Sequence, residues 1–152
     1  MSLTREWIES HIPHRGTMCL LEEVLSWDAT HARCRSSTHR RADNPLRAYD
    51  RLGAACGVEY AAQAMAVHGA LMAERSGSTA APGMLASVRN VQLHVERLDD
   101  IAADVIAAVQ WLAGDADTTL YEFSIAADGR VLLTGRAAIA LGKSTWGSAV
   151  GR

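Results

Sequence analysis

Two polar side chains interrupt a long apolar segment of the sequence, Leu52 to Met72. Glu59 stands among small and apolar residues, and Gln63 follows four residues later, on the same face of a helix. Burial raises the pKa of a carboxyl group by favouring its neutral form, and a carboxyl that is protonated near neutral pH suits general acid–base catalysis. We therefore predict that Glu59 is a general acid or base oriented by Gln63. A Glu on a narrow solvent-exposed stripe, or one paired with an Arg, is the structural alternative.

The start of the same segment has a second chemical feature. The sequence Leu52-Gly53-Ala54-Ala55 would place the free N–H groups of a helix start beside small side chains. Such a helix end can polarise a carbonyl oxygen, as an oxyanion hole does. Gly53 and Ala54 are therefore candidates for binding a substrate carbonyl, although every helix offers such an end.

Three further polar residues precede the apolar segment. His14 is held by the preceding Pro13 but has no partner that the sequence identifies, which favours a structural role. His39 and Asn44 lie in the irregular stretch that leads to the apolar segment, so they could fold back towards Glu59. The alternative is that both are ordinary polar loop residues.

The elements that must position these residues follow from periodicity and turn signals. Asp50 is the predicted N-cap of one long helix from Arg51 to Arg75, and breaker residues from Ser76 to Gly83 end it. Asp128-Gly129 predicts a tight hairpin turn, because Gly tolerates positive φ. Extended segments are expected at Cys19–Trp27, Thr30–Ser37, Met84–Val95, Ile101–Leu112, Thr118–Ala126 and Val131–Leu141, and a short helix at Thr4–Ser10.

A helix that is apolar on nearly all faces must be enclosed by other elements. Two strands before it and four after it predict an α+β domain, in which one antiparallel sheet curls around one long central helix. The 152 residues suit a single domain with its core at about 12–141. The Gly/Ser-rich tail from Gly142 onward is expected to fray.

Composition excludes several classes of function. The net charge of −2 and the lack of a Lys/Arg block argue against nucleic acid as a partner. Three cysteines without CxxC or Cys/His spacing argue against a disulfide framework and a zinc site, and favour a reducing cytoplasm. The N-terminal residues do not have the pattern of a signal peptide. The apolar segment carries Glu59, Gln63 and His68, which makes it a poor membrane span.

Three segments carry a resemblance to a known family: IPHRGTMCLLEEVLSW, GVEYAAQAMAVHG and GMLASVRNVQLHV. Together they resemble the FabA/FabZ class of 3-hydroxyacyl-acyl-carrier-protein dehydratases, and within it the ApeP-like branch associated with aryl polyene biosynthesis. IPHRGTMCLLEEVLSW resembles the opening "LPHR…LLVDRV" pattern of the class. GVEYAAQAMAVHG resembles the central "EAMAQ" helix, and GMLASVRNVQLHV resembles the strand that follows that helix. The segments occur in the order that the class requires.

The resemblance implies a hotdog fold, and a dimer whose sheets join side by side with acyl tunnels at the interface. It implies a catalytic pair, a His before the helix and an acidic residue within it, that comes from different protomers. The acidic residue corresponds to Glu59. The motif's glutamine corresponds to Gln63, which the resemblance places among the substrate-binding residues together with Gly53 and Ala54, the residues whose amides hold the thioester carbonyl. The implied partners are an acyl carrier protein and a second hotdog subunit, identical or different.

The sequence departs from the class at the histidine. The class places His, Phe and Pro about fourteen residues before the acidic residue, and that count from Glu59 reaches Pro45, next to Asn44. Asn cannot abstract a proton, although it can hydrogen-bond a thioester oxygen or a water molecule. The base is therefore expected to be His39, or His14 reaching across the dimer, or a His of the partner subunit.

Three functions remain open on the sequence. The leading one is dehydration of a 3-hydroxyacyl thioester carried on the phosphopantetheine of an acyl carrier protein, with protonated Glu59 as the acid and no metal or redox cofactor. The second is a hotdog thioesterase in which Glu59 activates water and Asn44 positions the substrate. The third is a non-catalytic hotdog subunit that completes a heterodimeric dehydratase.

Overall fold

The computed structural model describes residues 3–142. The helices are α1 (Arg5–His11) and α2 (Gly57–Arg75), and three short 3-10 turns lie at Gly16–Met18, Thr38–Arg40 and Ala54–Cys56. The strands are β1 (Leu3–Thr4), β2 (Glu23–Trp27), β3 (His31–Ser36), β4 (Gly83–Leu93), β5 (Val105–Gly114), β6 (Thr118–Ala127) and β7 (Arg130–Leu141).

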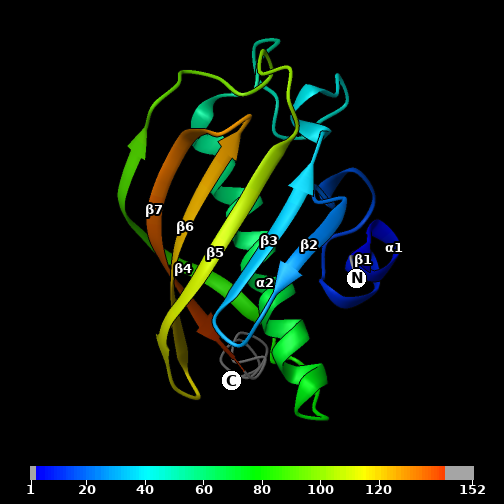
Figure 1. Ribbon diagram of the computed structural model, residues 1–152, viewed down its shortest axis with the longest axis vertical. Coiled ribbons are helices and arrows are strands. Elements are labelled where there is room, and N and C mark those ends of the chain that lie inside the picture. The colour runs from blue at the N-terminus through cyan, green and yellow to red at the C-terminus, as the bar shows by residue number, and fades with distance from the viewer. Residues whose placement is uncertain (1–2, 143–152) are drawn as a thin grey trace, which may run out of the picture.

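These strands form one antiparallel sheet in the order β1-β2-β3-β5-β6-β7-β4. The sheet is strongly curved, and α2 lies against its inner face (Figure 1). The strand that follows α2, β4, returns to the far edge of the sheet beside β7. This is the hotdog arrangement, so the predicted α+β fold is confirmed.

Small residues allow the sheet to approach α2 closely. Buried positions occur around most of the helix circumference, and the remaining stripe is half-buried and contains Glu59, Ala62, Ala66 and Gly69. At Gly57, an added Cβ atom would lie only 2.6 Å from a methyl carbon of Leu133 on β7. The close approach of the first turn of α2 to the sheet therefore depends on a residue without a side chain.

The predicted start of the helix was wrong. The α-helix begins at Gly57 rather than Arg51, and Asp50 is not its N-cap but adopts a left-handed backbone with φ of 65°. The peptide groups of Leu52 are used elsewhere, because its N–H donates to Asp99 Oδ1 and its carbonyl accepts from Leu98 N–H, each at 2.8–2.9 Å. Tertiary hydrogen bonds thus hold this segment extended where local propensity predicts a helix.

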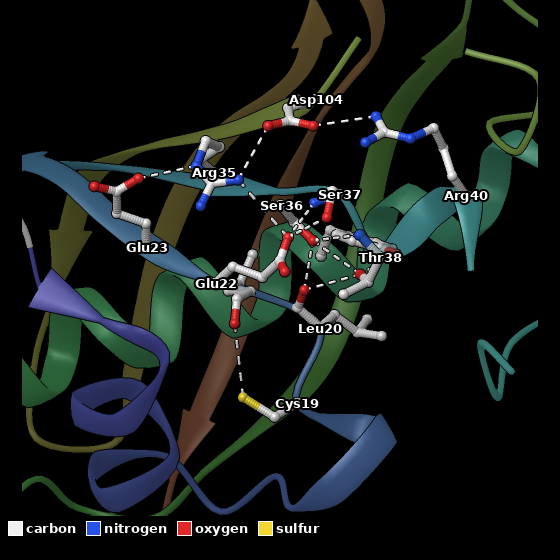
Figure 2. A network of polar contacts seen from close by, with 12 residues as sticks. Cys19, Leu20, Glu22, Glu23, Arg35, Ser36, Ser37, Thr38, Arg40 and Asp104 are labelled. Atoms are coloured by element: carbon white, nitrogen blue, oxygen red, sulfur yellow. Dashed lines mark hydrogen bonds and ion pairs between the residues drawn. The ribbon is translucent and has the colours of Figure 1, made fainter. Parts of the chain in front are cut away.

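The strand predictions agree with the structure apart from their ends. The largest differences are at the starts of two strands, where residues 19–22 and 101–104 are not strand; Cys19–Leu21 is buried coil. Cys19–Leu21 shows the physical reason. There the Leu20 carbonyl accepts hydrogen bonds from the hydroxyls of Ser36 and Thr38, as Figure 2 shows, and these replace the ladder bonds of a strand. The Asp128-Gly129 turn is confirmed, with φ of 51° and 74°. From Lys143 onward, the tail that was expected to fray lies outside the described residues.

Among residues 3–142, no helix is both long and apolar enough to cross a membrane.

Tyr60 joins α2 to the segment that precedes it. Its ring is fully buried, and its hydroxyl lies 2.8 Å from Thr38 Oγ1 and 2.9 Å from Asn44 Nδ2. Since Tyr60 directly follows Glu59, this contact also fixes the first turn of α2 on which that carboxylate stands.

We expect Tyr60→Phe to lower the free energy of unfolding by about 1–3 kcal/mol, because it leaves a buried amide hydrogen of Asn44 without its partner and removes one hydrogen bond of the buried Thr38 hydroxyl. Denaturant unfolding measures the change. The matched control is Tyr49→Phe at an exposed tyrosine, which should leave the midpoint where it is. Equal midpoints for the wild-type protein and Tyr60→Phe would contradict this role of the hydroxyl.

Candidate active site

His14 and Glu59 form a pair within one chain. Glu59 belongs to the first turn of α2, and His14 to the loop between α1 and the 3-10 turn at Gly16–Met18. His14 Nε2 lies 3.3 Å from Glu59 Oε1. About a quarter of the His14 side chain and a third of the Glu59 side chain are exposed. The structure therefore supplies the partner of His14 that the sequence did not identify, and the two residues meet without a second subunit.

Gln63 contacts Glu59 and the segment that follows His14 in the chain. Its side chain is fully buried one turn after Glu59. Its Oε1 accepts a hydrogen bond from Leu20 N–H at 2.9 Å, while its Nε2 donates to Met18 O at 2.7 Å and to Glu59 Oε1 at 3.4 Å. The predicted orientation of Glu59 by Gln63 is thus present in the structure.

The His14–Glu59 pair faces a large apolar cavity. Its volume is about 800 Å³, and it extends along one face of α2 to the start of β4 and the ends of β5, β6 and β7. Apolar side chains dominate the lining, among them Met65, Met72, Leu85, Trp111, Ile139 and Leu141. Such a cavity can accept an apolar chain and exclude water from the pair.

The charge of Glu59 differs from the prediction. The hydrogen bond from His14 lowers the pKa of Glu59, and it outweighs partial burial, which acts in the opposite direction. Gln63 adds a smaller lowering effect. Glu59 is therefore a carboxylate at neutral pH, and the expected raised pKa was wrong because the sequence did not reveal that His14 is its hydrogen-bond donor.

Asn44 is occupied by structural hydrogen bonds. Its Nδ2 donates to Thr38 O and to the Tyr60 hydroxyl, each at 2.9 Å, and its Oδ1 accepts from Leu46 N–H at 2.9 Å. The side chain is buried and does not line the cavity. This placement gives Asn44 no group for a thioester oxygen or a water, in contrast to its predicted role.

His39 is also separate from the cavity. It is fully buried, and its Nε2 lies 3.0 Å from Ile101 O. Burial lowers the pKa of His39, so the imidazole is neutral at neutral pH. The structure thus brings His14, rather than His39, to Glu59.

Gly53 and Ala54 precede α2 rather than cap it. Ala54 N–H donates to Glu96 O at 3.0 Å, as part of a bridge that pairs Gly53 with Arg97. The Ala54 amide is therefore not free for a substrate carbonyl, contrary to its predicted role. The role of Gly53 as a carbonyl-binding residue stays a prediction.

One polar pair in the cavity wall was not among the predicted site residues. His68 Nδ1 lies 2.7 Å from the Tyr121 hydroxyl, and His68 Nε2 lies 3.1 Å from Asp28 O. Both side chains are buried and line the cavity. His68 comes nine residues after Glu59, roughly 13 Å further along the helix axis. The sequence feature that could have identified His68 is its position in a segment that is otherwise almost entirely apolar.

Comparisons with known proteins agree with this architecture. A family model described as ApeP-like, ApeP dehydratase, matches residues 6–144. The chain belongs to the ApeP dehydratase family. Membership of this family supports dehydratase or thioesterase-type chemistry on a hotdog fold. No curated protein matches the chain.

Solved structures show the same fold as this ApeP-like chain. The dehydratase heterocomplex ApeI:P from Xenorhabdus doucetiae contains a chain that is similar at a TM-score of 0.84 and 22% identity, with 95% of this chain and 97% of that chain covered. Zebra fish thioesterase superfamily member 2 gives a TM-score of 0.62 at 17% identity, with 92% of this chain and 99% of that chain covered. A mutant of a thioesterase from Pseudomonas aeruginosa gives 0.57 at 15% identity, with 80% of each chain covered.

We expect the ApeP-like chain to lose stability as the pH falls below about 6.5, the ordinary pKa of histidine. Burial lowers the pKa values of His39 and His68 in the folded protein, so the unfolded chain binds protons that the folded chain does not. Urea unfolding at pH 7.5 and 5.5 measures the effect. His39→Gln should reduce the difference between the two pH values, and His94→Gln, at an exposed histidine, should not. An unfolding free energy that is equal at both pH values would contradict the prediction.

Proposed function

We propose that this chain removes water from 3-hydroxyacyl thioesters carried on the phosphopantetheine arm of an acyl carrier protein. The observation that carries the proposal is the contact of His14 with Glu59 at the wall of an apolar cavity. An imidazole beside a carboxylate is suited to moving a proton, and the cavity is suited to holding an acyl chain. Membership of the ApeP dehydratase family supports elimination of water as the reaction.

In this mechanism His14 is both base and acid. Its imidazole takes the proton from the carbon next to the thioester carbonyl, and the Glu59 carboxylate stabilises the resulting imidazolium. The electron pair forms the new carbon–carbon double bond, and the hydroxyl group on the next carbon takes the proton from His14 and leaves as water. Glu59 starts as a carboxylate and ends as one, which agrees with its lowered pKa.

The thioester oxygen gains negative charge as the proton is removed, so a donor is needed there. From the family resemblance we propose the amide of Gly53 as this donor, because Ala54 N–H is already bonded to Glu96 O. The proposed reaction uses no metal or redox cofactor. We expect the protein to act in the cytoplasm.

A thioesterase that uses Asn44 is less consistent with the geometry. All hydrogen-bonding groups of that side chain are engaged by Thr38, Tyr60 and Leu46. A non-catalytic subunit is the third possibility from the sequence, and the presence of both His14 and Glu59 in one chain weighs against it.

We expect Glu59→Gln to fold normally and to slow dehydration by about 10²–10⁴-fold, the usual contribution of a positioned acid–base group. The assay incubates the purified chain with a 3-hydroxyacyl carrier-protein thioester and follows the product by mass spectrometry. The matched control is Glu74→Gln, because Glu74 also belongs to α2 and contacts a histidine, His11, at 3.2 Å. This variant should retain activity.

The same assay separates the three functions. Loss of water by the wild-type chain supports the proposal, whereas release of the free acid indicates a thioesterase. If the substrate is unchanged both by the chain alone and after co-expression with a second hotdog subunit, the dehydratase proposal is wrong. Activity of Glu59→Gln at the wild-type rate would reject the role of Glu59.

We further propose that β4 pairs with a second hotdog subunit, identical or different. β4 is an edge strand of the sheet and carries exposed apolar residues, with Met84 55% and Leu93 49% exposed. An exposed apolar edge strand favours association with another strand. The similarity to a chain of the ApeI:P heterocomplex supports a heteromeric pairing.

We expect the double substitution Met84→Lys and Leu93→Lys to prevent this association, because it places two charges on the apolar edge. Light scattering should show a dimer for the wild-type protein, alone or with its partner subunit, and a monomer for the variant. The exposed Tyr49→Phe variant serves as the control. A wild-type monomer under both conditions, or a variant that still dimerises, would contradict the proposed interface.

A further inference from the structure

We infer that Gln63 is a positioning residue that fixes the His14 loop against α2 and donates a hydrogen bond to the Glu59 carboxylate. Its effect on catalysis rests on the proposed function, whereas its effect on the charge of Glu59 does not. This role differs from the contact with substrate that the family resemblance implies for Gln63.

The orientation of the Gln63 amide is determined by its neighbours. Leu20 N–H requires an acceptor at 2.9 Å, and Met18 O requires a donor at 2.7 Å, so the oxygen must face Leu20 and the nitrogen must face Met18. The second hydrogen of the nitrogen then points to Glu59 Oε1 at 3.4 Å. A donor held in this direction favours the carboxylate form of Glu59, and it lowers the pKa of that group.

The segment that Gln63 holds is fixed on its other side by the sheet. The carbonyl of Leu20 accepts from Ser36 Oγ and Thr38 Oγ1, two contacts drawn in Figure 2. Leu20 is itself fully buried. The carbonyl of Leu20 is thus bonded to β3 and the turn after it, and its N–H is bonded to α2 through Gln63.

The loop between Ile12 and Leu20 is closed at its start as well. The Arg15 guanidinium donates to the carbonyls of Glu9, Ile12 and His14, and Arg5 donates to Gly16 O at 2.7 Å. The arginines hold the loop to itself and to α1, whereas Gln63 bonds it to α2. Gln63 therefore connects the segment carrying His14 to the helix carrying Glu59.

Gln63 has no hydrogen-bonding group left for a substrate. Both hydrogens of its amide nitrogen are donated and its oxygen accepts from a backbone amide, and the side chain is not part of the cavity wall. Its chemical influence must therefore pass through Glu59 and the His14 loop.

The test compares Gln63→Met with the wild-type chain by NMR titration of Glu59 in the full-length protein. Labelling the side-chain carboxyl carbon of glutamate provides the probe, and the signal missing from Glu59→Gln identifies Glu59. Gln63→Met keeps the length of the side chain but removes the donor, so the pKa of Glu59 should rise. Gln63→Glu, which places a second carboxyl beside Glu59, should raise it as well and serves if Gln63→Met does not fold.

The matched control is Arg5→Gln, which releases Gly16 O in the same loop without touching Glu59. It should leave the pKa of Glu59 at the wild-type value. In the dehydration assay, Gln63→Met should lower kcat by about 10-fold to 10²-fold with little change in KM.

An unchanged Glu59 pKa in both Gln63 variants would overturn the inference, as would an equal rise in Arg5→Gln. If the wild-type chain shows no dehydration, either alone or co-expressed with a second hotdog subunit, while the Glu59 pKa rises in the Gln63 variants alone, then the proposed function is wrong and the positioning role stands.

Discussion

Enclosure of α2 is the constraint on which the rest of the structure depends. A helix with apolar residues on nearly all sides has to be covered on all sides, because exposing any of them costs free energy in proportion to the apolar area left in water. The curved sheet covers most of the helix, and the stripe that it leaves half-buried lines the apolar cavity. Small residues such as Gly57 allow the contact to be close, since Leu133 leaves no space there for a side chain.

Polar side chains on such a helix need partners, and each partner fixes a different segment of the chain. Tyr60 holds the segment containing Thr38 and Asn44, and Gln63 holds the backbone of Met18 and Leu20. Because His14 approaches Glu59 from the loop that Gln63 bonds to this helix, the proposed acid–base pair meets within one chain, beside the apolar cavity. The few polar residues of α2 thus determine both how the surrounding loops are arranged on it and where the proposed chemistry takes place.

Much of this fold could be predicted from the sequence, because it depends on patterns that are local in the chain. The apolar run around Glu59 predicted a central helix, alternation predicted the strands, and Asp128-Gly129 predicted the last hairpin. The same patterns singled out Glu59 and Gln63 as polar residues in an apolar helix. The end of the helix was also predicted, at Arg75, since breaker residues follow it directly.

Only the tertiary structure decided which groups meet. His14 and Glu59 are 45 positions apart in the sequence, and no local pattern reveals that the loop after α1 packs against the first turn of α2. The charge of Glu59, the structural bonding of Asn44 and the late start of the helix all depend on partners distant in the sequence. A hydrogen bond between distant segments forms only once packing has brought donor and acceptor within about 3 Å, and the sequence does not contain that distance.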